Sequence, residues 1–122
     1  SSIDWRWDSQ TGTPTLSKTA KAIKREGYAK LYASIQITNS SGLTAGFASY
    51  IVLPFTPTET RDIPVAIKNT NLAYNAVWYI SLTSGSPNAY IYGTKSDNTV
   101  QTLTQSTIKN TTQISIGCEY LI

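Results

Sequence analysis

Few side chains in this 122-residue chain could perform catalysis. Histidine is absent from the sequence, which removes the commonest general base and metal ligand and every Ser-His or Cys-His nucleophile pair. The one cysteine, Cys118, cannot form an intrachain disulfide or a cysteine-histidine zinc site. Its position on the apolar side of an alternating segment predicts a small core residue. The sequence therefore predicts no catalytic residue, no cofactor and no metal.

Seven carboxylates remain as candidates for acid-base chemistry: Asp4, Asp8, Glu26, Glu59, Asp62, Asp97 and Glu119. A glycosidase places two carboxyl groups about 5–9 Å apart on either side of a sugar. Asp4 and Asp8 fall on one side of a strand about 13 Å apart by strand rise, which is too far. Pairs from different strands stay open. The composition favours a binding protein over an enzyme.

Aromatic residues are frequent, with three tryptophans and eight tyrosines. Trp78 shares a side of its segment with Ile80, which predicts a core position. Trp5 and Trp7 share a side with Ile3, and they belong either to the core or to a contact with a neighbouring subunit.

Most of the tyrosines lie opposite the apolar side of their segments: Tyr28, Tyr32, Tyr50, Tyr79, Tyr90 and Tyr92. Exposed rings of this kind stack on sugar rings, with polar neighbours that fix the ligand's orientation. Subunit contacts, where aromatic residues are enriched, are the alternative.

The hairpin around residues 86–88 supplies the combination that a saccharide needs. Asn88, Tyr90 and Tyr92 offer an amide beside two rings, and Asp97 in the nearby loop 94–98 would complete a pocket. We predict these four residues as the ligand site, against the alternative that they only close turns. The next candidate is the segment that carries Asp4, Arg6 and Asp8.

Period-two alternation of apolar and polar residues dominates the rest of the chain, as in residues 28–38, 75–83 and 114–122. Ser, Thr and Asn supply 39 residues (14, 18 and 7), which favours strands with polar outer faces and frequent turns. We predict one all-β domain over residues 1–122, an antiparallel β-sandwich or jelly roll of seven or eight strands. The predicted core includes Ile35, Ile37, Ile51, Trp78, Ile80 and Ile116.

Two segments are less regular. Ile63, Val65 and Ile67 predict one strand, and Pro64 within it favours a sheet edge because proline lacks an N–H donor. Residues 15–27 fit either a short helix that ends at Gly27 or a strand or irregular arm.

The net charge is +3, and half of the basic residues fall between Lys18 and Lys30. We interpret this cluster as a solvated basic face and predict no nucleic-acid partner. No apolar run approaches the roughly 20 residues that a membrane-spanning helix needs, which predicts no membrane insertion.

Three segments carry a resemblance to a known group: Thr15-Leu16-Ser17-Lys18 followed by the Gly27-Tyr28 step, Val65 to Asn71, and the final strand from Ile114 to Ile122. In residue class and rhythm the chain resembles the C-terminal head domains of bacteriophage tail fibres and receptor-binding proteins, especially those of phages of Gram-positive bacteria. Adenovirus-type fibre heads are the nearest alternative.

The resemblance implies a C-terminal fragment of a longer fibre protein, a homotrimer, and a place on the virion surface. It also implies non-catalytic adhesion to a receptor on the host cell, usually a saccharide. Two other functions stay open: a structural virion or baseplate module, and a carbohydrate-binding module of a bacterial hydrolase.

Overall fold

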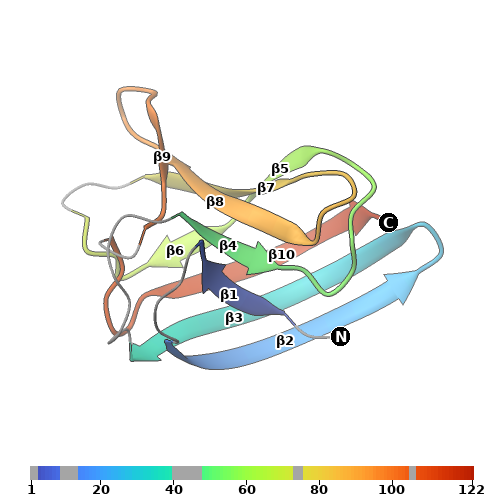
Figure 1. Cartoon of the computed structure of the whole chain (residues 1–122), viewed down its shortest axis with the longest axis horizontal. Helices are drawn as coiled ribbons and strands as arrows, with labels where there is room; N and C mark the ends of the chain where they lie inside the picture. Colours follow the sequence, from blue (N-terminus) through green and yellow to red (C-terminus); the bar gives the residue numbers. More distant parts are fainter. Residues whose placement is uncertain (1–2, 9–13, 40–47, 73–75, 105–106) are drawn as a thin grey trace.

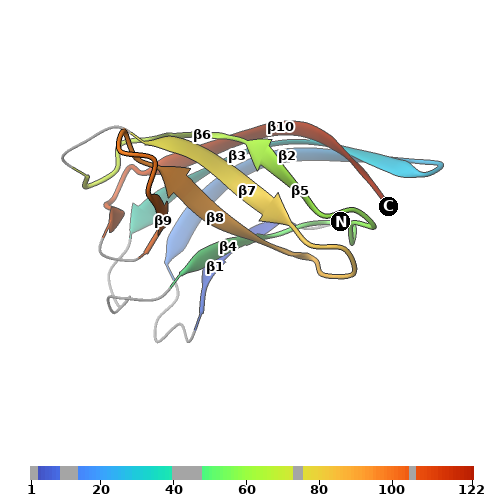
Figure 2. The same cartoon turned by 90° about the horizontal axis from the view of Figure 1, so that it is seen from above.

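The structure, a computed structural model, describes residues 3–8, 14–39, 48–72, 76–104 and 107–122. These residues form ten strands in two antiparallel sheets, with no α-helix among them (Figures 1 and 2). The strands are β1 (Asp4–Trp7), β2 (Thr15–Arg25), β3 (Tyr28–Asn39), β4 (Ser49–Val52), β5 (Arg61–Pro64), β6 (Ala66–Lys68), β7 (Val77–Leu82), β8 (Asn88–Thr94), β9 (Val100–Thr102) and β10 (Gln113–Leu121). The predicted all-β sandwich is confirmed, although the strand count is ten rather than seven or eight.

One sheet has four strands in the order β2-β3-β10-β6. Its two central strands carry the clearest alternation in the sequence, and they pair antiparallel over most of their length. Ile35 lies opposite Ile114, and Ala29 lies opposite Tyr120, all on the inner side of the sheet. The alternating residues between them face solvent, so the sheet has one apolar and one polar face.

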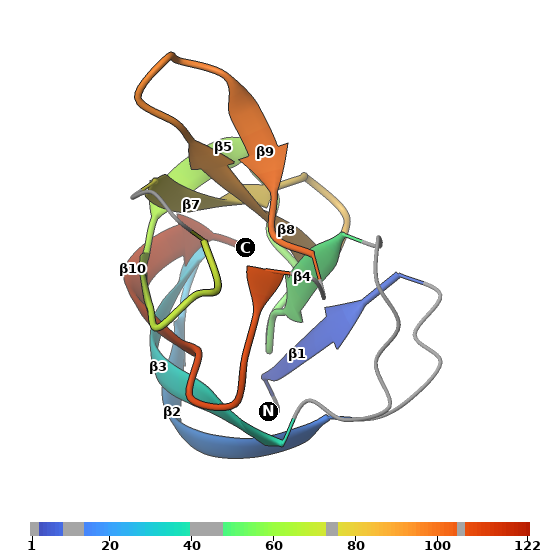
Figure 3. The same ribbon diagram turned by 90° about the vertical axis from the view of Figure 1, so that its left-hand side faces the viewer.

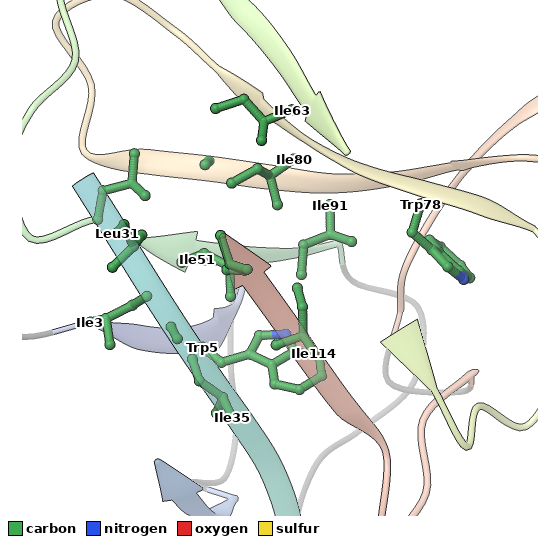
Figure 4. Packing of buried hydrophobic residues seen from close by; sticks show 14 of the residues in the cluster. Ile3, Trp5, Leu31, Ile35, Ile51, Ile63, Trp78, Ile80, Ile91 and Ile114 are labelled. Atoms are coloured by element: carbon green, nitrogen blue, oxygen red, sulfur yellow. The ribbon is translucent and has the colours of Figure 1, made fainter. Parts of the chain in front are cut away.

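The other sheet has six strands in the order β1-β4-β8-β7-β5, and β9 pairs with the remaining length of β8. Its inner face packs on the inner face of the four-stranded sheet, and Figure 4 shows buried side chains from both sheets meeting in one layer. The six residues predicted for the core are all at most 5% exposed. Their predicted strand phases are therefore confirmed.

Trp5 and Trp7 belong to this core rather than to the surface. Both are buried, and their rings stack with centroids 5.5 Å apart. Between the two alternatives left open by the sequence, the structure selects the core.

The segment predicted as one strand around Pro64 is two strands in different sheets. β5 pairs with β7 in the six-stranded sheet, whereas β6 pairs with β10 in the four-stranded sheet. Val65 stands at the corner, where its N–H donates to the carbonyl oxygen of Trp78 at 3.1 Å. The alternation of apolar and polar residues continues through this corner, so periodicity alone does not reveal that the chain passes from one sheet to the other. Pro64 lies on the edge strand β5, as predicted.

Residues 15–27 are not a helix. Thr15–Arg25 form the edge strand β2, and Gly27, with φ of 82°, turns the chain into β3. Every residue of β2 is exposed or half-buried, which explains why its sequence lacks a clear two-residue alternation. The β2–β3 hairpin extends past the other strands at one end of the sandwich (Figure 2).

Among the described residues there is no helix of the length and apolar character that a membrane crossing requires.

Candidate functional site

The outer face of the six-stranded sheet carries four tyrosines on three neighbouring strands, which we call the tyrosine platform: Tyr50 on β4, Tyr79 on β7, and Tyr90 and Tyr92 on β8. Each is half-buried. Tyr50 and Tyr90 are partners across the β4–β8 pair, with ring centroids 5.2 Å apart. Tyr79 and Tyr92 are partners across the β7–β8 pair, with centroids 5.8 Å apart. The register of three strands thus turns four separate residues into one aromatic surface.

Backbone geometry accounts for the shape of this surface. Successive outward residues of a strand are about 6.6 Å apart, and neighbouring strands are about 4.8 Å apart. The two tyrosine pairs therefore cover an area large enough for about two sugar rings. The platform lies on the side of the sheet that faces away from the core.

An acidic residue is bonded directly to the platform. The hydroxyl of Tyr90 donates a hydrogen bond to Oδ1 of Asp8 at 2.7 Å. This bond, with burial and the negative charge of Asp8 adding to it, raises the pKa of Tyr90 to about 12. Tyr90 therefore stays protonated at physiological pH, and its ring is held in one orientation.

Further charged residues surround the platform. Arg6 lies opposite Tyr50 on β1, and its Nε donates to Oδ2 of Asp4 at 2.9 Å. Asp62 on β5 contributes to the raised pKa of Tyr79, after the larger contribution of burial. Carboxylates accept hydrogen bonds from hydroxyl groups, and these bonds are stronger than neutral ones. The site therefore combines aromatic faces with acceptors suited to a polyhydroxylated ligand.

The four residues predicted as the ligand site do not form one pocket. Asn88, Tyr90 and Tyr92 alternate along β8 on its outer side, whereas Asp97 lies in the turn that follows β8. The turns before and after β8 lie at its opposite ends (Figure 1). Since β8 has seven residues, these ends are about 20 Å apart. The prediction that loop 94–98 completes a pocket with the 86–88 hairpin is therefore wrong.

Asp97 shapes its own turn. Its Oδ1 accepts hydrogen bonds from the hydroxyl of Thr99 at 2.6 Å and from the N–H of Thr99 at 3.0 Å. These bonds, the hydroxyl's first, lower the pKa of Asp97. The β8–β9 hairpin that carries this turn projects from the sandwich (Figure 3). Asn88 has a comparable local bond, because its N–H donates to Oγ of Ser86 at 3.2 Å.

The sequence identified the outward orientation of Tyr50 and Tyr79 but did not place them in the site. Their partners are set by which strands are neighbours, and alternation within one strand does not contain that information. The second candidate segment, with Arg6 and Asp8, proves to adjoin the platform.

Cys118 and the carboxylates are the remaining groups with reactive or metal-binding side chains. Burial raises the pKa of the half-buried Cys118 thiol to about 11, so the nucleophilic thiolate is scarce at neutral pH. Within the described ranges, no three His, Cys, Asp or Glu residues come together as a metal site would require.

No protein-family model, curated protein or solved structure matches this chain.

Proposed function

We propose that this chain is a receptor-binding head domain that attaches a virion, most simply that of a bacteriophage, to saccharide on the host cell surface without cleaving it. The observation that carries the proposal is the tyrosine platform with Asp8 bonded at its margin. Aromatic rings stack on the apolar faces of sugars, and the carboxylates beside them accept hydrogen bonds from the sugar hydroxyls.

The shape of the platform favours an extended chain of sugars over a single enclosed monosaccharide. Two contacting ring pairs lie on an open sheet face, so a polysaccharide can cross the strands and contact both. The acidic side chains Asp8 and Asp62 near the rings favour a neutral saccharide, because an anionic one would be repelled.

The fixed position of the rings also supports binding. Tyr50 and Tyr79 pack against their partners, and Tyr90 is held by Asp8. A side chain already confined to one rotamer loses little conformational entropy when a ligand binds. Most of the contact energy is then available as affinity.

The proposed head is a homotrimer. Val77 and Val100 are 71% and 60% exposed, and both lie beside Thr94 in one row across β7, β8 and β9. These valines share the outer face with Tyr79 and Tyr92, in the next row toward the β8–β9 turn, so a subunit contact there would border the platform. Light scattering at high protein concentration should give three times the 13.3 kDa chain mass. A monomer that binds saccharide would instead favour a carbohydrate-binding module of a hydrolase, and binding only to another virion protein would favour a structural module.

A glycan array of neutral cell-wall oligosaccharides, probed with the purified chain, tests the binding itself. We expect Tyr92→Ala to weaken binding to the recognised glycan about tenfold, in the range of a hot-spot residue. Tyr92→Phe should retain most of the affinity, because it keeps the ring.

Tyr32→Ala is the matched control, since Tyr32 lies on the outer face of the opposite sheet. Each variant must first show the wild-type melting temperature. Equal binding of neutral glycans by wild type and folded Tyr92→Ala would contradict the proposal.

A further inference from the structure

The outer face of the four-stranded sheet carries a separate exposed ring. Tyr32 on β3 is 54% exposed, and its partner on β10 is Gly117. A Cβ atom added to Gly117 would lie 3.6 Å from Cδ1 of Tyr32. One edge of the ring therefore lies beside Gly117, at ordinary van der Waals distance from where a Cβ would stand. The exposed part of the ring is open to solvent.

Hydroxyl-bearing and apolar side chains both lie beside this ring. A shallow depression of about 330 Å³ lies beside Tyr32. Its lining combines Thr19, Lys21, Ser34 and Ser115 with the apolar residues Ala20, Ala33 and Ile116. These residues come from β2, β3 and β10, and the small side chains leave the depression open. An exposed aromatic ring beside hydroxyl groups is suited to a sugar ring.

The charge of this face is opposite to that around the tyrosine platform. Across β2, β3 and β10, the charged side chains on the outer face are Lys21, Arg25, Lys30 and Glu119. Lys21 lies directly opposite Tyr32 in the β2–β3 register. Glu119 is engaged by Lys30, with Nζ to Oε1 at 3.3 Å. The face therefore has a net positive charge next to its exposed ring.

The other two lysines of the basic cluster serve the fold instead. Nζ of Lys18 donates to the carbonyl oxygen of Ile3 at 3.0 Å and joins the two sheets. Nζ of Lys24 lies 5.8 Å from the ring centroid of Phe55, a cation–π distance. The basic cluster is thus divided, with Lys18 and Lys24 on the inner side of β2 and Lys21 and Arg25 on its outer side.

We propose that the outer face around Tyr32 is a second saccharide site, selective for a sugar that carries carboxylate or phosphate groups. The sugar ring stacks on the exposed part of the Tyr32 ring, and the ammonium group of Lys21 binds the anionic group. Ser115 binds a sugar hydroxyl, and Ser34, whose Oγ accepts a hydrogen bond from Nε2 of Gln113 at 2.5 Å, donates its own hydroxyl to the sugar. This site is independent of the proposed receptor function, because it lies on the opposite sheet.

Isothermal titration with three hexasaccharides tests the proposal: hexagalacturonate for carboxylate, phosphorylated maltohexaose for phosphate, and maltohexaose as the neutral analogue. We expect one or both anionic probes to bind, the neutral one to bind at least about tenfold more weakly, and the affinity to fall with added salt. Binding of only one anionic probe identifies which group is recognised. Equal binding of the neutral probe at this face would overturn the proposal.

Two variants assign the binding to this face. Tyr32→Ala should weaken binding of the anionic probe about tenfold, whereas Tyr92→Ala on the other sheet should leave it unchanged. Lys21→Gln should weaken it about two- to fivefold, in the range of an exposed charge pair. Lys95→Gln removes the same charge from the β8–β9 turn and should have no effect.

The Gly117→Val variant distinguishes a loss of binding from a loss of folding. The added side chain displaces the ring of Tyr32, while valine favours an exposed strand more than glycine does. We expect unchanged or higher thermal stability together with loss of the anionic probe. Full retention of binding in folded Gly117→Val, or in folded Tyr32→Ala, would overturn the proposal and leave the tyrosine platform untouched.

Discussion

Gly93 on β8 is the position where adding one methyl group should do the most damage. It is the partner of Trp78 on β7, and it faces the core. A Cβ atom at this position would lie 2.7 Å from both Cε3 and Cζ3 of the indole ring. Trp78 is only 5% exposed, so a shift of its ring disturbs the core residues packed around it. We predict that Gly93→Ala destabilises the protein.

The magnitude follows from two opposing effects. Overpacking a filled core costs about 1–3 kcal/mol. Replacing glycine by alanine also restricts the unfolded chain, which stabilises by about 0.4–1 kcal/mol where the backbone conformation is compatible. The net loss should be about 1–2 kcal/mol. For a chain of this length, each kcal/mol lowers the melting temperature by about 4 °C, so we expect a decrease of about 4–8 °C.

Thermal unfolding followed by circular dichroism measures this difference, with Gly117→Ala as the matched control. A Cβ at Gly117 meets Tyr32 only at 3.6 Å, an ordinary contact on the exposed face. Gly117→Ala should therefore be neutral or slightly stabilising. Trp78→Leu removes the colliding ring atoms, so Gly93→Ala should cost less in that background. Additive effects of the two changes, or a melting temperature raised by Gly93→Ala, would refute the reasoning.

Two further predictions concern the core and the platform. Ile80→Ala removes a fully buried side chain and should cost about 2–5 kcal/mol in the free energy of unfolding, whereas the outward Gln36→Ala should change it by less than about 0.5 kcal/mol; equal denaturant midpoints for the two variants would disprove the strand phases. The pKa of Tyr90, about 12, lies above its usual value near 10, so its contribution to stability is complete below pH 10 and is lost as the pH rises through 12. Asp8→Asn should lower this pKa in a spectrophotometric titration of the tyrosines, and an unchanged titration would show that the bond to Asp8 is not its cause.

The sequence alone was enough to predict the strands that have one face on the core and the other in solvent. β3 and β10 have one face on the core and one in solvent, so the alternation of Ile35 and Ile114 with polar residues predicts both their structure and their burial. The same reasoning predicted Trp78 and Ile80 correctly. Burial of one face produces an alternation of apolar and polar residues within each strand, so it can be predicted from that strand's own sequence.

The edge strand β2 and the corner at Val65 were harder to predict from the sequence pattern. β2 lies at a sheet edge with its residues exposed or half-buried, so its sequence was equally compatible with a helix. The alternation around Val65 continues while the chain passes from one sheet to the other. In both places the deciding contacts are with strands distant in sequence, and local periodicity does not specify them.

The tertiary structure alone decided which residues form the candidate sites. Tyr90 and Tyr92 were predicted from one hairpin, but Tyr50 and Tyr79 join them only because β4 and β7 are the neighbours of β8. Asp97, though near in sequence, lies beyond the end of that strand. A site on a sheet face runs across strands, perpendicular to the chain, so its members are set by strand order and register, and these depend on packing of the whole core.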